Sequence, residues 1–221
     1  MRELTERALD VAQSQGATYA DIRIVRRENQ DMSVKNGVVQ TLSLDDDFGF
    51  GVRVVADGAW GFASSNRLNR EEIDRVSKLA VTVAKASALV KQADVDLGPP
   101  EVHVDTYRTP FEIDPFEVSL EDKIDVLMAA DKEARSVKGL AIARGTMGFQ
   151  RETKTFASTE GSYIEQTLVE SGMGITVYAM GAGEMQQRSY PNSFGRHQGT
   201  AGYEFVQQWD LPGHAKRVAE E

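Results

Sequence analysis

The sequence predicts an α+β fold with two antiparallel sheet regions, each accompanied by a long helix, and an additional helix at the N-terminus. Three observations support this class. Along the 221 residues, the apolar positions twice change from helical spacing to strict alternation. The dipeptides Asn36-Gly37 and Asp57-Gly58 separate alternating segments and readily adopt the positive φ angles of type I′ hairpin turns. Two long apolar stripes at helical spacing begin just after helix-capping residues, Asn69 and Ser119.

Residues 1–97 are predicted to form the first α+β domain. An amphipathic helix is expected over residues 3–15, because its apolar side chains recur on one face and a glycine follows. Residues 20–64 alternate in polarity between turn signals and are expected to form an antiparallel meander. Asn69 and Glu72 then form a capping-box-like start for a helix of about five turns, which should cover one face of the sheet.

A second α+β domain is predicted for residues 98–221. The cluster Gly98-Pro99-Pro100 breaks any regular element, and we place the domain boundary there. Ser119 and Asp122 are expected to cap a second long helix, which Gly139 ends. The second antiparallel region is expected in four segments, residues 140–151, 153–158, 162–170 and 172–180.

The C-terminal part of the chain begins with a segment rich in glycine. Residues 181–203 hold five glycines together with Pro191-Asn192, a composition that is typical of a loop. Pro212 is expected at the first position of a last helix. No stop signal precedes Glu221, so we expect the chain to end inside an element.

Composition and charge exclude several classes of function. The net charge is −9, the pI is about 5.0, and Arg26-Arg27 is the longest basic run, which argues against phosphate-backbone binding and therefore against a nucleic-acid partner. The chain has no cysteine, so a disulfide framework, a thiolate zinc site and a cysteine nucleophile are excluded. No apolar run approaches the ~20 residues of a membrane helix. We therefore expect a cytoplasmic protein with no membrane partner.

The three histidines do not predict a metal site. His103, His197 and His214 are far apart in sequence, and none stands at helical spacing from another. His103 alternates with valines and is expected to be the outward residue of a short strand. His197 is interpreted as a solvent-facing loop residue, with contact to a substrate or partner as the alternative, and His214 is expected at the start of the last helix. No zinc site shared by two of them is supported.

Two short motifs between residues 45 and 51 allow a functional and a structural interpretation. Asp45-Asp46-Asp47 could bind a hard cation, but ligands of a calcium loop are spaced, so a solvated turn between strands is favoured. Gly49-Phe50-Gly51 superficially resembles a phosphate-binding loop. It leads directly into a strand instead of a helix, and a strand or bulge relieved by glycine is favoured.

Aromatic and serine residues add no catalytic candidate. Trp60 and Phe62 share a strand parity, as do Phe48 and Phe50, and we expect these four to pack in the core. The serines lack a Gly-x-Ser-x-Gly elbow. We therefore assign no catalytic, cofactor-binding or metal-binding residue to this chain.

Three strings in the same order resemble the amino-terminal part of the TldD/PmbA family. They are residues 45–63, from Asp45-Asp46-Asp47-Phe48-Gly49 to Trp60-Gly61-Phe62-Ala63, then Phe156-Ala157-Ser158-Thr159-Glu160-Gly161-Ser162, and Gly199-Thr200-Ala201-Gly202-Tyr203-Glu204. The resemblance covers essentially the whole chain and is closer to the TldD branch than to PmbA. It implies a zinc metallopeptidase, or its catalytically silent partner, that acts on peptides and unfolded segments. Proteins of this family were once labelled modulators of DNA gyrase.

The sequence departs from the family pattern in one respect. Active members carry a His-Glu-x-x-x-His helix in which two histidines bind zinc, and no histidine here is followed by glutamate. In the family that motif lies beyond the region matched here, so the resemblance implies zinc in the full-length protein and none bound to this chain.

Two functions remain open from the sequence. The first is the peptide-guiding and dimer-forming portion of a TldD-like zinc metallopeptidase, with this portion inactive alone. The alternative is a non-catalytic peptide-binding or assembly module that resembles the silent PmbA-type partner. The resemblance implies a homodimer or a heterodimer with a PmbA-type paralogue. A free edge of an antiparallel sheet could receive an extended peptide as an added strand, although the sequence does not show which strand is the edge.

Overall fold

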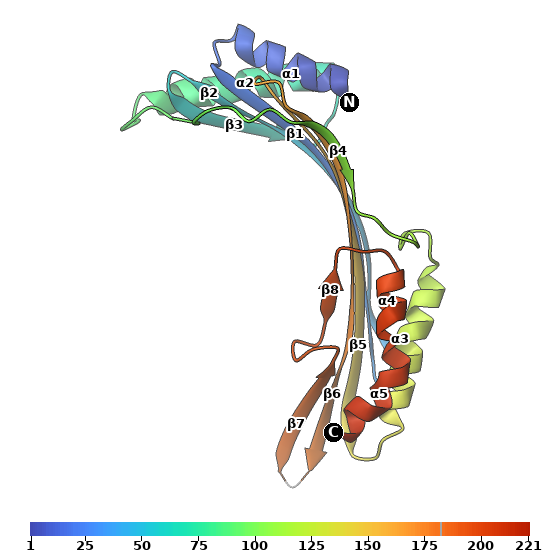
Figure 1. Ribbon diagram of the computed structural model, residues 1–221. Helices are drawn as coiled ribbons and strands as arrows, with labels where there is room; N and C mark the ends of the chain where they lie inside the picture. Colours follow the sequence, from blue (N-terminus) through green and yellow to red (C-terminus); the bar gives the residue numbers. More distant parts are fainter. Residues whose placement is uncertain (182) are drawn as a thin grey trace. The chain divides into compact units, whose positions relative to one another are not determined.

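A computed structural model describes residues 1–181 and 183–221 (Figure 1). The described residues form five helices and eight strands. In chain order these are α1 (Arg2–Ser14), β1 (Tyr19–Lys35), β2 (Val38–Ala56), β3 (Ala59–Ser65), α2 (Arg70–Ala88), β4 (Val104–Arg108), α3 (Leu120–Arg135), β5 (Leu140–Ser158), β6 (Tyr163–Gly181), β7 (Glu184–Tyr190), β8 (His197–Gly199), α4 (Glu204–Trp209) and α5 (Leu211–Glu220).

The strands belong to one eight-stranded sheet, which confirms the predicted α+β class. Its order is β3-β2-β1-β5-β6-β4, and β7 and β8 also pair with β6. The two expected sheet regions are therefore parts of a single sheet. Strands β1, β2, β5 and β6 contain 17 to 19 residues each, so the shorter segments expected over residues 140–180 are joined into two continuous strands.

The chain divides into two compact units that are interleaved in sequence. Unit 1 contains residues 1–27, 47–107 and 152–167, and unit 2 contains the rest of the described chain. The units are interleaved because the four long strands each contribute residues to both. The division at residues 97 and 98 rests on a change in composition, a different criterion, and stays a prediction.

In unit 1, helices α1 and α2 pack on one face of the sheet. Their buried alanines and valines share a core with apolar residues of β1, β2 and β3. Gly61 on β3 lets α2 approach the strand closely: a Cβ there would collide with the Ala80 carbonyl oxygen and lie 2.5 Å from the backbone nitrogen of Ala84. The predicted cap of this helix is confirmed, since the Asn69 side chain accepts a hydrogen bond from the Glu72 N–H at 2.8 Å.

In unit 2, helices α3, α4 and α5 contribute to a second core. Here methionine and aromatic side chains of the strands pack against leucine, alanine and valine of the helices. The Ser119 side chain caps α3 by accepting a hydrogen bond from the Asp122 N–H at 3.0 Å, as predicted. Unlike the first core, this one also encloses charged groups, because Lys123 and Asp131 are both completely buried.

Both predicted hairpin turns are confirmed. Asn36 and Gly37 have φ angles of 50° and 77°, and Asp57 and Gly58 have 51° and 73°. Positive φ at both central positions is the requirement of a type I′ turn. The first turn joins β1 to β2 and the second joins β2 to β3.

Two expectations about irregular segments are wrong. Asp45-Asp46-Asp47 does not form a turn but lies inside strand β2, where Gly49-Phe50-Gly51 also lies as expected. Within residues 181–203, β7 and β8 are strands on β6, and α4 follows immediately afterwards. Two glycines of this region have a packing cause: a Cβ on Gly199 would collide with the Phe205 ring, and a Cβ on Gly202 would collide with the Ile113 carbonyl oxygen.

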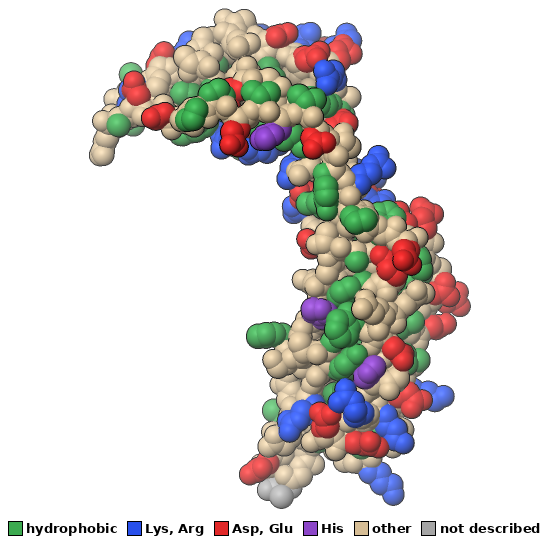
Figure 2. Space-filling model, viewed as in Figure 1, with side chains coloured by type: hydrophobic (Ala, Val, Ile, Leu, Met, Phe, Trp, Pro, Cys, Tyr) green, Lys and Arg blue, Asp and Glu red, His purple; other side chains and the backbone are tan. Residues whose placement is uncertain are grey.

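Figure 2 shows acidic and basic side chains interspersed over the visible surface of each unit. None of the helices described is both long and apolar enough to cross a membrane.

Candidate functional site

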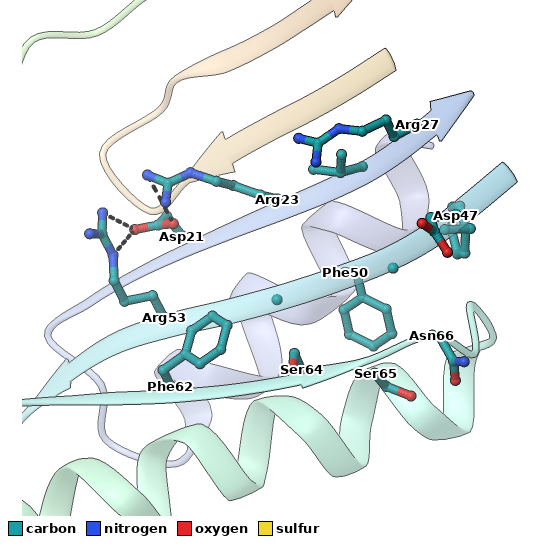
Figure 3. Close-up of a pocket in the computed structure, with 14 residues that line it drawn as sticks. Asp21, Arg23, Arg27, Asp47, Phe50, Arg53, Phe62, Ser64, Ser65 and Asn66 are labelled. Carbon is teal, nitrogen blue, oxygen red and sulfur yellow. Dashed lines mark hydrogen bonds and ion pairs between the residues drawn. The ribbon is translucent and has the colours of Figure 1, made fainter. Parts of the chain in front are cut away.

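A hollow of about 610 Å³ opens on the sheet of unit 1 (Figure 3). It is lined by three neighbouring strands, β1, β2 and β3. Three arginines stand at it, Arg23 and Arg27 from β1 and Arg53 from β2, while Phe62 comes from β3. Cavities of this size hold ligands as large as a few amino-acid residues. The hollow is therefore the main candidate for a binding site in unit 1.

Alternation along the strands creates this hollow. On β1, Ile22 and Ile24 face the helices and are buried, so Asp21 and Arg23 face the opposite side. On β2, Gly49 and Gly51 both line the hollow and contribute no side chain to it. The ring of Phe62 occupies part of this space, since a Cβ on Gly51 would lie 2.7 Å from it.

The expectation that Trp60 and Phe62 are core residues is wrong. Helix α2 takes the opposite face of β3, where Ala59, Gly61 and Ala63 point, and leaves Trp60 36% and Phe62 58% exposed. Phe50, by contrast, is buried as expected, and Phe48 packs at the edge of the same core. The aromatic side chains of β3 are therefore available to a ligand.

A buried carboxylate organises one end of the hollow. Asp21 is only 1% exposed, and its Oδ2 accepts hydrogen bonds from the Tyr19 hydroxyl at 3.0 Å and from Arg53 Nε at 2.8 Å. The Arg53 guanidinium also lies 4.7 Å from the centre of the Trp60 ring. These contacts fix the Arg53 side chain in one orientation, which lowers the entropic cost of binding through it.

The electrostatics of this cluster favour a bound anion. Burial and the negative charge of Asp21 raise the pKa of Tyr19 to about 12, so the hydroxyl stays neutral. Burial alone would lower the pKa of Arg53, but the hydrogen bond and charge of Asp21 outweigh it and raise that pKa. Arg23 Nη2 lies 3.7 Å from Asp21 Oδ1, beyond hydrogen-bond distance. One carboxylate thus faces two guanidinium groups.

The remaining charged groups of the hollow are paired or lie away from Arg53. Arg27 forms an ion pair with Glu152 of β5. Asp47 lies at the end of the hollow away from Arg53 (Figure 3). The net positive charge is therefore concentrated at Arg23 and Arg53.

Unit 2 offers a second feature, an unpaired strand edge. Strand β3 pairs only with residues 50–56 of β2. Among the strands described, β2 has β1 as its other neighbour, so residues 38–45 have no strand on their outer edge. Four apolar side chains of this segment are between 41% and 57% exposed; they are Val38, Val39, Leu42 and Leu44. An edge of this kind exposes backbone groups that can pair with an added strand.

His103 lies apart from the other two histidines, which belong to one cluster of aromatic rings linked through Trp209 and Tyr190. His103 precedes β4 and is exposed, and its backbone carbonyl accepts a hydrogen bond from the Tyr163 N–H. His197 is not a loop residue: it belongs to β8 and packs against Phe205 and Trp209. His214 lies in α5, as expected, and stacks on Tyr190 at 4.3 Å between ring centres.

The part of the chain that the structure describes contains no group of three or more His, Cys, Asp or Glu side chains arranged to hold a metal ion. The three histidines therefore do not fit a zinc site of the kind that the family resemblance implies for the full-length protein.

Sequence reasoning weighed Asp45-Asp46-Asp47 and Gly49-Phe50-Gly51 as binding motifs and favoured structural interpretations, although Asp47 and Gly49-Phe50-Gly51 line the hollow. It did not select the arginines. One signal was present, because Asp21 and Arg23 alternate with Ile22 and Ile24 and so share a face. Arg53 and Phe62 could not be added to that face, since strand register and the position of α2 decide it. The free edge of β2 was anticipated only as a possibility, without a strand.

Two models of protein families match the chain. Residues 20–84 match PmbA/TldA metallopeptidase domain 1, and residues 113–221 match the PmbA/TldA metallopeptidase central domain. The chain thus has an α+β fold and contains two domains of the PmbA/TldA metallopeptidase type. The chain belongs to the PmbA/TldD family, as the resemblance of its sequence strings indicated.

Curated relatives include two archaeal metalloproteases. That of Methanocaldococcus jannaschii is 28% identical over 170 residues, which are 76% of this chain and 37% of the relative. That of Methanothermobacter thermautotrophicus is 25% identical over 204 residues, which are 91% of this chain and 42% of the relative. The chain thus spans about two fifths of the length of these relatives.

Solved structures share the fold. TldE from Thermococcus kodakarensis superimposes with a TM-score of 0.75 at 16% identity, over 98% of this chain and 46% of that one. A Thermotoga maritima protein, described as a candidate modulator of DNA gyrase, superimposes with a TM-score of 0.74 at 17% identity. The match covers 100% of this chain and 47% of that one. At such identities the similarity establishes the fold alone.

Proposed function

We propose that this chain is the peptide-guiding and dimer-forming portion of a TldD-like zinc metallopeptidase that acts on peptides or unfolded segments in the cytoplasm. Membership of the family and the names of the relatives support the peptidase part of the proposal. The zinc would be held by residues outside the match to this chain. The chain alone is inactive in this account.

The observation that carries the peptide-guiding role is the free edge of β2. On the side away from β1, residues 38–45 have no neighbouring strand among those described, and main-chain pairing gives affinity that tolerates many sequences. The exposed side chains of Val38, Val39, Leu42 and Leu44 supply apolar contacts to whatever peptide is added. Unfolded segments expose both backbone hydrogen-bonding groups and apolar side chains, so the edge suits such a ligand.

The alternative is a non-catalytic peptide-binding or assembly module, similar to the silent PmbA-type partner. The free edge favours this alternative equally, because edges also join copies of a chain or paralogues. The two proposals differ in the full-length protein: only the first requires zinc and hydrolysis. Zinc content and cleavage of a denatured protein, measured on the uninterrupted gene product, separate them.

The peptide-guiding role is tested by affinity. We expect a fluorescein-labelled, permanently unfolded protein, such as reduced and carboxymethylated lactalbumin, to bind with a change in anisotropy. The double substitution Val39→Lys and Leu42→Lys should weaken binding about tenfold, equivalent to about 1.4 kcal/mol, because charge at an edge opposes strand addition. Val90→Lys is the matched control, since Val90 is 82% exposed in unit 1. Equal affinity of the edge variant and the control contradicts the proposal.

The dimer-forming role has a separate test. Size-exclusion chromatography with light scattering should give twice the 24.3 kDa of this chain, or a complex with a PmbA-type paralogue. A mass of 24.3 kDa at all concentrations, with and without the paralogue, contradicts dimer formation by this portion.

A further inference from the structure

From the hollow of unit 1 we infer a pocket for the C-terminal residue of a peptide, with Arg23 and Arg53 binding its carboxylate and Phe62 contacting an apolar side chain. The inference rests on the proposed peptide-guiding function and adds the chemistry of the preferred peptide. It concerns unit 1 alone, whereas the free edge lies in unit 2.

Charge is the first argument for a carboxylate. Asp21 accepts two hydrogen bonds from Arg53 and Tyr19 and is itself buried, so its single charge leaves one guanidinium charge in excess. The excess falls mainly on Arg23, whose other described contact is with the Phe156 ring, at 5.3 Å from its centre. Arg23 therefore keeps planar donors for a second carboxylate, a geometry that guanidinium groups bind well.

Preorganisation is the second argument. Arg53 is held by a hydrogen bond to Asp21 and by the Trp60 ring, whereas Arg23 makes a 3.7 Å ion-pair contact with Asp21 and lies beside the Phe156 ring. The fixed Arg53 guanidinium loses little side-chain entropy when it binds a ligand. A salt bridge between two exposed, mobile side chains would lack this advantage.

The apolar part of the hollow decides between two kinds of carboxylate. An internal Asp or Glu brings charge with little apolar surface, whereas a C-terminal Leu or Phe carries a carboxylate and an apolar side chain on one residue. The hollow places the exposed ring of Phe62 near the arginines, and Gly49 and Gly51 of β2 leave space there because they carry no side chain. Its volume of about 610 Å³ accepts an apolar residue together with its neighbour.

Three labelled pentapeptides of equal length test the inference by fluorescence anisotropy. The first ends in Leu-Phe with a free carboxylate, the second is its C-terminal amide, and the third has an internal Glu with an amidated Leu-Phe end. We expect the free acid to bind at least tenfold more tightly than either amide. Equal binding of free acid and amide, equal binding of the internal-Glu peptide, or no measurable binding of the free acid overturns the inference.

Variants identify the site. Arg23→Gln should reduce the ratio of affinities for acid and amide to below threefold, while Arg7→Gln, which removes an arginine of unit 1 paired with Asp74, should leave it unchanged. Gly49→Val should weaken binding of the free acid at least fivefold, because the new side chain fills part of the hollow. The backbone tolerates this change, since φ at Gly49 is not in the left-handed region and the nearest atom to a Cβ there is Ser65 O at 3.5 Å. Near-ultraviolet circular dichroism, to which Trp60 and Trp209 both contribute, verifies that the variants are folded. A ratio unchanged in Arg23→Gln overturns the inference.

The edge variant separates this inference from the proposed function. If Val39→Lys with Leu42→Lys weakens acid and amide alike and their ratio is near one, the peptide-guiding edge stands and the carboxylate pocket is wrong. If the ratio is high and depends on Arg23 but the edge variant binds normally, the pocket stands and the edge is wrong.

Discussion

The two units stabilise their parts of the single sheet in different ways. Unit 1 brings its helices close through alanine and glycine and encloses an apolar core on one sheet face, while arginines and aromatic rings occupy the opposite face around the hollow. Unit 2 uses larger methionine and aromatic side chains and buries Lys123 and Asp131 completely. In unit 1 the partly exposed Arg23 and Arg53 lie at the hollow beside the buried Asp21, and in unit 2 Lys123 and Asp131 are enclosed in the structure.

The largest difference between the two units is expected from a substitution at Gly61. We expect Gly61→Val to lower the free energy of unfolding of unit 1 by about 3 kcal/mol or more, because its side chain would collide with the backbone of α2 at Ala80 and Ala84. Trp60 lies in unit 1 and Trp209 in unit 2. The fluorescence of variants that keep only one tryptophan therefore follows the urea unfolding of each unit separately. Gly49→Ala is the control and should change little. Equal loss at both tryptophans would show that the shared strands make the units unfold together.

A second test uses the buried lysine of unit 2. Lys123 donates hydrogen bonds to Gln30 Oε1 at 2.7 Å and to the Pro115 carbonyl at 2.5 Å. Burial lowers its pKa from 10.5 to about 8, although the charge of Asp114 acts in the opposite direction. The folded state therefore holds this proton less tightly than the unfolded chain does.

The sign of the pH dependence follows from that difference. Between about pH 8 and pH 10.5 the unfolded chain binds more protons, so the free energy of unfolding of unit 2 rises with pH, by at most about 1.4 kcal/mol per pH unit. Unfolding followed at Trp209 at pH 7.5 and pH 9.5 measures it, and Lys123→Met should remove the rise. The same slope in Lys123→Met contradicts this explanation. In unit 1, Tyr19 acts in the opposite sense above pH 10, because its folded pKa is raised to about 12 and the stabilisation is lost as pH increases.

The smallest expected effects come from the two helix caps, one in each unit. Asn69→Ala should destabilise unit 1 and Ser119→Ala unit 2, each by about 1 kcal/mol, because each leaves one N–H at a helix start without its partner. Each variant should shift the transition of its own tryptophan more than that of the other. Identical shifts at both tryptophans would contradict the separation into units.

Local features of the fold could be predicted from the sequence, and features that depend on distant residues could not. The turns at Asn36-Gly37 and Asp57-Gly58 and the caps at Asn69 and Ser119 depend on a few neighbouring residues, and all four are confirmed. Strand β2 continues through Asp45-Asp46-Asp47, although three acids in a row usually favour a turn, because pairing with β1 outweighs local preference.

The candidate site was harder to predict for the same reason. The exposure of Trp60 and Phe62 depends on which face of β3 helix α2 covers. Alternation shows that these two residues share a face of the strand, but it does not show which face the helix covers. The glycines of β6 at positions 172 and 174 reflect close packing against residues 195–198, which composition alone assigned to a loop. Helix α4, with six residues, is too short to give a periodic signal.

Hydrogen–deuterium exchange with and without an unfolded protein tests the central claim, strand addition at the edge of β2, most directly. Bound reduced and carboxymethylated lactalbumin should slow exchange of backbone amides within residues 38–45, because added main-chain hydrogen bonds protect them, and should leave the amides of α2 and α3 unchanged. Saturating binding with no slowing in residues 38–45 would contradict the account.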